Sequence, residues 1–405
     1  MPLSLAAPAV PDPMDAPAIR WGILAPGGIA NVFAEAVAQG TRSSVVAAGS
    51  RSAERAHEFT ARHGIARAHG SYADLVADPD VDAVYVASPH SEHREHALLA
   101  LRAGKPVLVE KAFTRSLAEA EEVLDAAASG GLLAAEAMWS RYLPTYDVVR
   151  RTVAAGTLGD VVLVEADHGQ RLWPGGPARL SQPDLAGGAL LDLGVYPVSF
   201  ADHVLGGFDD VAARGILTDL GVDATTTIDA RGPGGGLARV WCTMAAATAC
   251  PARVVGTQAR LELSGRFYEV DSTVRLVGPD ETVLDEFVPE VREHGFRYEA
   301  AEVARALAEG RHETWSMPWD ATRRVLAAMD EVRRQLGVVY PASDRMRDPV
   351  RVATASVLLP GRACRRPSAR ERGEEDGLEV LGPGRGVGLA LGRRGDVPQR
   401  LGIGA

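Results

Sequence analysis

Lysine and asparagine are almost missing from this chain of 405 residues. Lys105 and Lys111 are the only lysines, so 41 of the 43 basic residues are arginine, and Asn31 is the only asparagine. Such a bias is typical of a GC-rich gene. A lysine kept under this bias is expected to do chemistry that arginine cannot, because arginine stays protonated whereas lysine can release its proton. The alternative is that one or both lysines remain by chance. Of the two, only Lys111 has sequence surroundings that favour a chemical role.

Cysteine is scarce, and long apolar runs are missing. Cys242, Cys250 and Cys364 are too few and too badly spaced for a disulfide framework or a cysteine-based zinc site. No apolar run reaches the roughly 18–20 residues of a membrane span. No Arg or Lys precedes Arg20, so the charged start of a secretory signal is missing. We expect a cytoplasmic protein.

A histidine-based metal site is not expected either. His90, His93 and His96 are spaced by three residues, which spreads them unevenly around a helix. No carboxylate joins them at a spacing typical of zinc sites. The sequence therefore predicts no bound metal.

Positive charge is in deficit, with a formal net charge of −10. From Ala342 onward 12 arginines face 8 acidic residues, so the preceding chain carries −14. Nucleic acids and anionic membranes both attract proteins through local positive charge. We therefore expect a small-molecule substrate, and neither nucleic acid nor membrane as a partner.

The pattern of apolar runs changes once along the chain. Residues 18–138 alternate short apolar runs with amphipathic stretches, which predicts a Rossmann domain of the α/β class with a doubly wound parallel sheet. Residues 139–343 carry successive strand candidates separated by turn residues, which predicts an α+β domain with a large, mostly antiparallel sheet. We expect residues 1–17 and the Arg/Gly/Pro-rich residues 344–405 to be disordered tails.

A glycine-rich turn follows the first strand candidate, and it approximates G-x-G-x-x-[GA]. Small residues there let a pyrophosphate approach the free N–H groups at the start of the next helix. The alternative is a glycine-rich connection without a ligand, because alanine replaces the first glycine. The candidate cofactor residues in this turn are Ala25, Gly27, Gly28, Ile29 and Ala30.

The residues at the end of the second strand candidate indicate which of the two cofactors, NADP or NAD, the protein binds. NAD-binding proteins usually place Asp or Glu there for the ribose hydroxyls, but this chain has Arg51 between Ser50 and Ser52, with Arg55 following. Arginine can form a bidentate charged contact with a 2′-phosphate. We expect NADP(H) rather than NAD(H); the alternative is that Arg51 is only a solvated residue at a turn.

Two further segments carry chemically useful side chains. Glu110 and Lys111 close the fourth strand candidate, at the sheet edge where α/β proteins bind ligands. Asp192 and Tyr196 lie four residues apart in the segment 187–197 and are expected to share one face of a helix. A lysine ammonium beside Tyr196 would lower the pKa of its hydroxyl.

These three anchors, namely the glycine-rich turn, Glu110-Lys111 and the block 187–197, resemble the Gfo/Idh/MocA oxidoreductases, the glucose-fructose oxidoreductase and inositol dehydrogenase family. The resemblance spans about residues 18–341. Within the family the chain is most similar to the branch of dimeric dihydrodiol dehydrogenase and NADP-dependent D-xylose dehydrogenase. Tyr196 stands where inositol-dehydrogenase-like members have His, and Ala112 replaces the proline of the family's Glu-Lys-Pro motif.

The resemblance implies roles for particular residues. Lys111 and Tyr196 would form the acid/base pair, and Asp192 would orient the substrate and the lysine; which of the pair carries the proton stays open. The cofactor would also contact Glu110, Lys111 and three residues after the third strand candidate: Ser88, Pro89 and His93. Substrate contacts are expected from Glu136, Trp173 and Arg179, against the alternatives of a helix cap for Glu136 and surface-loop positions for the other two.

The sequence therefore predicts an NADP(H)-dependent dehydrogenase acting on a hydroxyl of a cyclic substrate, an aldose such as D-xylose or a trans-dihydrodiol. The alternatives are a dinucleotide-sensing regulatory protein without catalysis and a redox-assisted glycosidase. The segment 240–244 has little strict alternation of apolar and polar residues. Its sheet is therefore expected to form a homodimer or a higher homo-oligomer through an exposed face.

Overall fold

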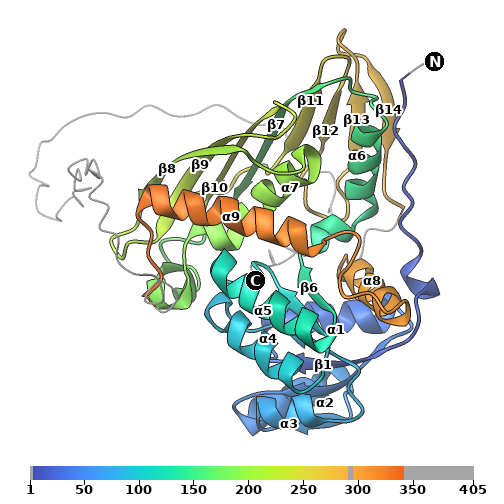
Figure 1. The fold of residues 1–405 in the computed structure, drawn as a ribbon, viewed down its shortest axis with the longest axis vertical. Helices are drawn as coiled ribbons and strands as arrows, with labels where there is room; N and C mark the ends of the chain where they lie inside the picture. Colours follow the sequence, from blue (N-terminus) through green and yellow to red (C-terminus); the bar gives the residue numbers. More distant parts are fainter. Residues whose placement is uncertain (1–2, 291–294, 342–405) are drawn as a thin grey trace, which may run out of the picture. The chain divides into compact units, whose positions relative to one another are not determined.

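A computed structural model describes residues 3–290 and 295–341, which form two β-sheets with their covering helices (Figure 1). The first sheet has the strand order β3-β2-β1-β4-β5-β6, and every neighbouring pair is parallel. Its strands are β1 (Arg20–Leu24), β2 (Ser44–Gly49), β3 (Arg67–His69), β4 (Ala83–Val86), β5 (Val107–Glu110) and β6 (Ala134–Ala137). This is the predicted doubly wound Rossmann sheet.

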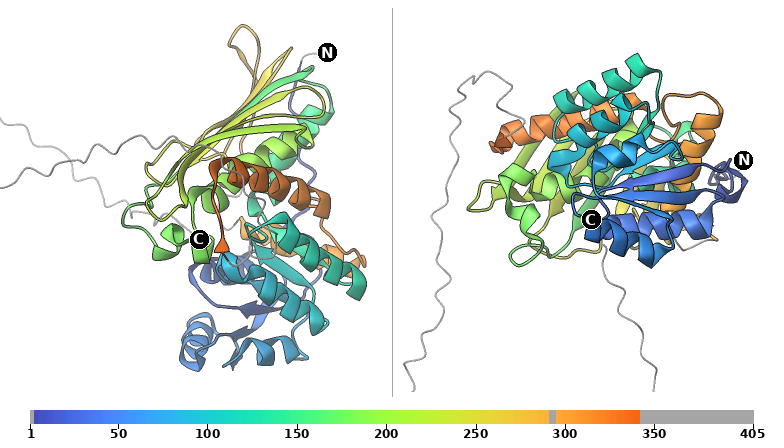
Figure 2. Two further views of the ribbon diagram at one scale, coloured as in Figure 1. Left: turned by 60° about the vertical axis from the view of Figure 1, so that its left-hand side comes forward. Right: turned by 90° about the horizontal axis from the view of Figure 1, so that it is seen from below.

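Helices lie on both faces of this sheet, as the view from below shows (Figure 2). They are α1 (Gly28–Gly40), α2 (Ala53–His63), α3 (Tyr72–Ala77), α4 (His93–Arg102) and α5 (Leu117–Gly130). Burial on two faces explains why the central strands read as unbroken apolar runs; all four residues of β4 and of β5 are buried. Serine side chains cap three of the helices by accepting hydrogen bonds from Arg55 N, Asp74 N and Glu119 N.

The second sheet has the strand order β14-β13-β12-β11-β7-β10-β9-β8, and only β7 and β10 pair in parallel. Its strands are β7 (Val161–Gly169), β8 (Asp210–Leu217), β9 (Asp223–Arg231), β10 (Leu237–Thr243), β11 (Ala252–Gly256), β12 (Arg260–Leu263), β13 (Val274–Val277) and β14 (Val283–Phe287). The predicted mostly antiparallel sheet is confirmed.

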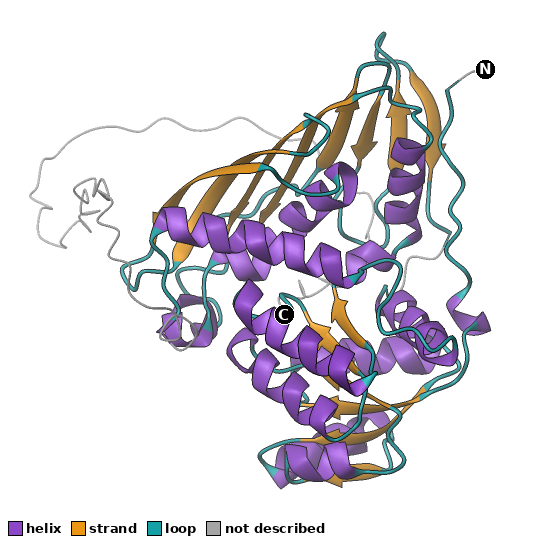
Figure 3. Ribbon diagram, in the orientation of Figure 1, coloured by secondary structure: helices purple, strands orange, loops and turns teal. Residues whose placement is uncertain are grey.

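One face of this second sheet packs against helices (Figure 3). They are α6 (Pro144–Ala154), α7 (Val195–Leu205) and α9 (Trp319–Leu336). Residues of β9 and β10 alternate between buried and exposed, so the opposite face of those strands is open. The last two helices also contact the first sheet's helices, because α8 (Phe296–Ala308) packs on α1 and α9 packs on α5.

Within the predicted disordered tail 1–17, residues 3–17 are described, and there the structure corrects the prediction. The backbone of this segment is bound by side chains of the second domain: Leu5 N donates to Asp285 at 2.9 Å, Ala6 N to Thr152 Oγ1 at 3.0 Å and Ala9 N to Asp147 at 2.7 Å. The Ala/Pro-rich composition showed no regular element, and distant carboxylates and a hydroxyl hold the backbone here. The predicted tail 344–405 lies outside the described residues.

Within residues 3–290 and 295–341, no helix is long and apolar enough to cross a membrane. In the same ranges, no three His, Cys, Asp or Glu side chains are grouped so that they would hold a metal ion.

Candidate active site

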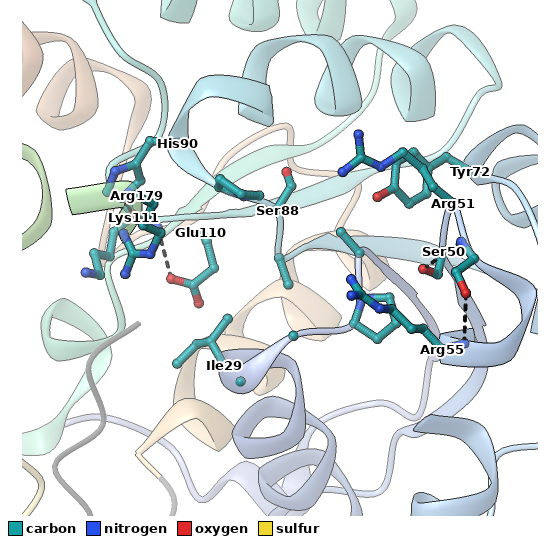
Figure 4. A pocket seen from close by; sticks show the side chains of 17 residues that line it. Ile29, Ser50, Arg51, Arg55, Tyr72, Ser88, His90, Glu110, Lys111 and Arg179 are labelled. Atoms are coloured by element: carbon teal, nitrogen blue, oxygen red, sulfur yellow. Dashed lines mark hydrogen bonds between the residues drawn. The ribbon is translucent and has the colours of Figure 1, made fainter. Parts of the chain in front are cut away.

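A pocket of about 420 Å³ lies at the carboxyl ends of the parallel strands. Figure 4 shows Lys111, Arg179, His90 and Glu110 at one end and Ser50, Arg51, Arg55 and Tyr72 at the other, with Ser88 between them. The structure thus brings together residues that are distant in sequence. The predicted cofactor residues that line the pocket are Ala25, Gly27, Gly28, Ile29, Ser50, Arg51, Ser52, Arg55, Ser88, Pro89, Glu110 and Lys111.

The glycine-rich turn lines the pocket with backbone and leaves space for a ligand beside it. Ala25 has a left-handed φ of 64°, a conformation that favours glycine and explains the usual glycine at this position. Gly27 precedes α1 without a side-chain cap, so the first N–H groups of that helix are free. A Cβ added at Gly28 would meet no atom within 4 Å. Ala30 does not line the pocket; it is buried and packs in the core beneath the helix.

The end formed by Arg51 and Arg55 is exposed and positively charged. Both arginines are solvent-exposed, and neither forms an ion pair with any described residue. Tyr72 lies beside Arg51; burial raises the pKa of its hydroxyl, and the charge of Arg51 offsets part of that rise. Sequence reasoning missed Tyr72. A signal was available, since Ser71 caps α3 at a strand end adjacent to that of β2.

At the opposite end, Lys111 is almost completely buried, with 4 % of its side chain exposed. Its Nζ donates to the backbone oxygen of Asp192 at 2.9 Å and lies 3.7 Å from Asp192 Oδ1. The same Nζ lies 5.1 Å from the centre of the Tyr196 ring. The peptide bond between Lys111 and Ala112 is cis. The predicted constellation of Lys111, Asp192 and Tyr196 is therefore assembled in space.

Asp192 lies on a π-helical turn, Leu190–Gly194, directly before α7. Burial alone would raise the pKa of its carboxyl, but the charges of Lys111 and Arg179 outweigh it and the pKa is lowered. Arg179 Nη1 is 3.3 Å from Asp192 Oδ1. Asp192 is therefore a carboxylate that fixes two cations at the head of the pocket.

Asp223, at the start of β9, holds this turn in place. Its Oδ2 accepts hydrogen bonds from Leu190 N and Thr226 Oγ1, both at 2.8 Å. Gly188 passes so close that a Cβ there would lie 2.2 Å from Asp223 Oδ1. The glycine-rich start of the segment 187–197 thus serves a close approach between backbone and carboxylate.

Tyr196 corrects one expectation, because its hydroxyl is not made acidic. Burial raises the pKa of Tyr196 well above its ordinary value, although the hydrogen bond from Trp139 Nε1, at 3.0 Å, lowers it in part. Lys111 Nζ lies over the ring of Tyr196. The rings of His168 and Tyr268 pack at 5.0 and 4.9 Å from the Tyr196 ring. Sequence reasoning found neither of these two residues nor Trp139, since they come from separate parts of the chain.

Besides Ala30, three predicted contact residues do not line the pocket. His93 is fully buried, and its ring nitrogens face the backbone oxygens of Ser88 and Ala112 at 2.7 and 2.9 Å, so His90 lines the pocket instead. The Glu136 carboxylate accepts from Phe113 N at 3.1 Å and from Thr322 Oγ1 at 2.8 Å, which makes it a structural link.

Trp173 packs against a small apolar cluster that contains Leu180 and Leu193, away from the pocket. Arg179 lines the pocket as predicted. The loop that joins β7 to the π-helical turn therefore contributes a charged side chain, and not its tryptophan, to the site.

Comparison with known families assigns both domains. Residues 19–137 match the oxidoreductase family with the NAD-binding Rossmann fold, and residues 146–262 match the GFO/IDH/MocA C-terminal domain. The chain belongs to the Gfo/Idh/MocA oxidoreductase family.

Relatives in this family are similar over nearly their whole length. A trans-1,2-dihydrobenzene-1,2-diol dehydrogenase of Danio rerio is 36% identical over 332 residues, which cover 80% of this chain and 98% of the relative. The D-xylose 1-dehydrogenase (NADP(+)) of Hypocrea jecorina is 36% identical over 365 residues, with 80% and 93% covered. A crystal structure of a 3-ketoreductase from Actinomadura kijaniata, in complex with NADP and TDP-benzene, superposes with a TM-score of 0.69 at 30% identity. It covers 79% of this chain and 98% of that protein.

Proposed function

We propose that this Gfo/Idh/MocA protein is an NADP(H)-dependent dehydrogenase that acts on a hydroxyl group of a cyclic substrate, an aldose or a trans-dihydrodiol. The observation that carries the proposal is the meeting of Lys111 and Asp192 at the head of a pocket whose other end presents two arginines, neither of which has a carboxylate partner among the described residues. The matched relatives are dehydrogenases of a dihydrodiol and of D-xylose, which supports the substrate class.

The residues of the pocket fit a phosphorylated dinucleotide. Free N–H groups at the start of α1 and the open space at Gly28 suit a pyrophosphate. Arg51 and Arg55, which lack carboxylate partners among the described residues, suit a 2′-phosphate; Ser50 and Ser52 lie beside them. When bound, NADP(H) supplies the hydride acceptor or donor. The proposed cofactor is therefore NADP(H) in preference to NAD(H).

Lys111 is the residue that we assign to the proton. Its side chain lines the pocket, whereas Tyr196 does not and its hydroxyl is engaged by Trp139. In oxidation the amine form of Lys111 takes the proton of the substrate hydroxyl, and in reduction the ammonium returns it. Asp192 keeps Nζ in place through its backbone oxygen and its carboxylate. Tyr196 supports the lysine with the face of its ring.

Incubation with NADP+ or NAD+ and a panel of aldoses and diols tests this function through the absorbance of the reduced nicotinamide. Reduction of NADP+ by a cyclic substrate is the expected result. Tight NADP(H) binding without reduction by any substrate would favour the dinucleotide-sensing alternative. Cleavage of a glycoside without net consumption of cofactor would favour a redox-assisted glycosidase.

A cytoplasmic homodimer is the assembly that we propose. The open sheet face carries exposed Ile216 and Leu237, 68% and 51% accessible. Beside them one cross-strand row alternates acidic and arginine side chains: Asp229, Arg239, Glu165, Arg253, Glu262, Arg275 and Glu286. Two such faces stacked with an offset of one strand would place arginine against acid. Sedimentation showing only monomer at micromolar concentration would contradict the dimer.

A further inference from the structure

Asn31 is the only asparagine in the chain, and the function proposed above gives it no part. It lies in the first turn of α1, directly after the glycine-rich turn that lines the pocket. Aspartate has nearly the same shape and is far easier to find in this chain, which contains 53 acidic residues. What distinguishes Asn31 from an aspartate is its amide nitrogen, the part of the side chain that can donate hydrogen bonds.

Both halves of the Asn31 side chain form hydrogen bonds. Nδ2 donates to the backbone oxygen of Gly27 at 2.8 Å and lies 3.4 Å from that of Gly28. Oδ1 accepts from Arg62 Nη1 at 3.1 Å and from His63 Nε2 at 2.8 Å. A guanidinium can only donate and a backbone oxygen can only accept, so these partners fix the orientation of the amide. An aspartate could accept from Arg62 and His63, but it would have nothing to donate to Gly27.

These contacts join the start of α1 to the last turn of α2. Among the described residues, both side-chain hydrogen bonds between the two helices end on Asn31. At the other end of α2, its cap Ser52 and Arg55 in its first turn line the pocket; Figure 4 shows Arg55 and, at the start of α1, Ile29. Helix α2 has 11 residues and is about 16 Å long. A shift of its last turn would therefore also displace Arg55.

We propose that Asn31 is a positioning residue for NADP(H), which sets the spacing between the glycine-rich turn and the arginines at the exposed end of the pocket. The inference rests on the proposed function. The contact of Nδ2 holds the turn at which the pyrophosphate would bind, so it serves NADPH and NADH alike. The contacts of Oδ1 hold α2, so they serve only the cofactor whose 2′-phosphate reaches Arg51 and Arg55.

Asn31→Ala removes both halves of the link and should affect the two cofactors unequally. A hydrogen bond is worth a few-fold in affinity, so the dissociation constant should rise about threefold for NADH and about tenfold for NADPH. Calorimetric titration of the full chain with each cofactor measures both constants. Gln39→Ala, at an exposed position in the last turn of α1, is the control and should match the wild type. Equal weakening of the two cofactors, or none, would overturn the proposal.

Asn31→Asp separates positioning of the cofactor from a purely structural role. Its carboxylate can still accept from Arg62 and His63, and negative charge in the first turn of a helix is stabilising. The Tm without cofactor should therefore equal or exceed that of the wild type. The carboxylate cannot donate to Gly27 and places negative charge beside the pyrophosphate, so both cofactors should bind about tenfold more weakly. A structural role alone predicts that affinity follows Tm, and wild-type affinity in Asn31→Asp would contradict the proposal.

The double variant Arg62→Ala/His63→Ala breaks the same link from the side of α2. In the wild type, Asn31→Ala should lower the preference for NADPH over NADH about threefold. In the double variant it should leave that preference unchanged, because the contact is already lost. The same loss in both backgrounds would show that Asn31 does not act through α2 and would overturn the proposal. If the wild type binds neither cofactor, the proposed function itself is wrong.

Discussion

The two ends of the pocket hold positive charge in opposite ways. Lys111 and Arg179 share one buried carboxylate, Asp192, and Lys111 is almost inaccessible to solvent. Arg51 and Arg55 are exposed and have no carboxylate partner within the described residues. The cations at one end are held by a buried carboxylate; those at the other end await a ligand that brings negative charge.

This difference indicates that the buried end positions a catalytic side chain and that the exposed end binds the cofactor. A buried ion pair gives exact placement, but its charges are already satisfied and add little affinity for an anion. Exposed arginines lose less on desolvation and keep their full capacity for a phosphate. We therefore expect substitutions at the buried end to change turnover, and substitutions at the exposed end to change cofactor affinity.

Lys111→Arg should have the largest effect. Arginine keeps the charge, but it cannot release a proton at working pH, and its larger head would disturb the contacts with Asp192. Turnover should fall by about two to four orders of magnitude, while NADPH affinity stays close to that of the wild type. Steady-state kinetics and NADPH titration measure both.

Lys105→Arg is the matched control for that variant. Lys105 Nζ donates to the backbone oxygens of Asp78 and Val81, at 2.9 and 2.6 Å, which arginine can also do. Its turnover should be nearly unchanged. Equal activity in the two arginine variants would remove Lys111 from the mechanism.

Arg51→Ala should weaken NADPH binding by about one to two orders of magnitude, the worth of a hydrogen-bonded charge contact of roughly 1.5–3 kcal/mol. The affinity for NADH should stay the same, because NADH lacks the 2′-phosphate. Dissociation constants for both cofactors decide the matter, with exposed Arg102, at the end of α4, replaced by alanine as the control. A wild-type preference for NADPH in Arg51→Ala would show that this end does not select the phosphate.

Gly188→Ala should loosen the buried end without removing any charged side chain. The added Cβ would lie 2.2 Å from Asp223 Oδ1, at a φ of 116° that alanine rarely adopts. We expect a loss of about 1–3 kcal/mol in the free energy of unfolding, measured in urea, together with reduced turnover. Gly104→Ala has a similar φ of 77° but open space around its Cβ, so it should lose less and keep its turnover. Equal losses in both would mean that the contact with Asp223 is unimportant.

Deletion of residues 1–12 should have the smallest effect and alter neither end. It removes backbone hydrogen bonds to Asp285, Thr152 and Asp147, so the Tm should fall by about 2–4 °C. Turnover and NADPH affinity should stay unchanged. A change in either one would show that the segment influences the pocket.

The fold and most of the cofactor site could be predicted because their determinants are local. A buried parallel strand is a short apolar run, and the residues at its carboxyl end reach the ligand edge wherever the rest of the chain goes. Ala25, Arg51 and Lys111 are all of this kind. The family motif added Asp192 and Tyr196, whose neighbours no local pattern identifies.

The predictions that were wrong concern residues whose surroundings come from distant parts of the chain. His93 and His90 differ by three residues, and only the path of the backbone decides which of them faces the pocket. Glu136 is taken up by Thr322 of α9, far along the chain. The high pKa of Tyr196 results from burial among elements that include Trp139 and Tyr268. Burial is a property of the assembled fold, so the sequence offered only the lysine's charge as a guide.

The central claim is that the exposed end of the pocket sets cofactor affinity and the buried end sets turnover. The double variant Arg51→Ala/Lys111→Arg tests it most directly. Titration with NADPH gives the dissociation constant, and stopped-flow mixing of the NADPH complex with the carbonyl form of the substrate, which accepts the hydride, gives the rate of hydride transfer. Both are measured for the wild type, both single variants and the double variant. The account predicts that the double variant combines the affinity of Arg51→Ala with the hydride-transfer rate of Lys111→Arg, because the sites are separate and their effects add. A double variant whose rate or affinity departs strongly from those values would contradict the separation of binding from catalysis.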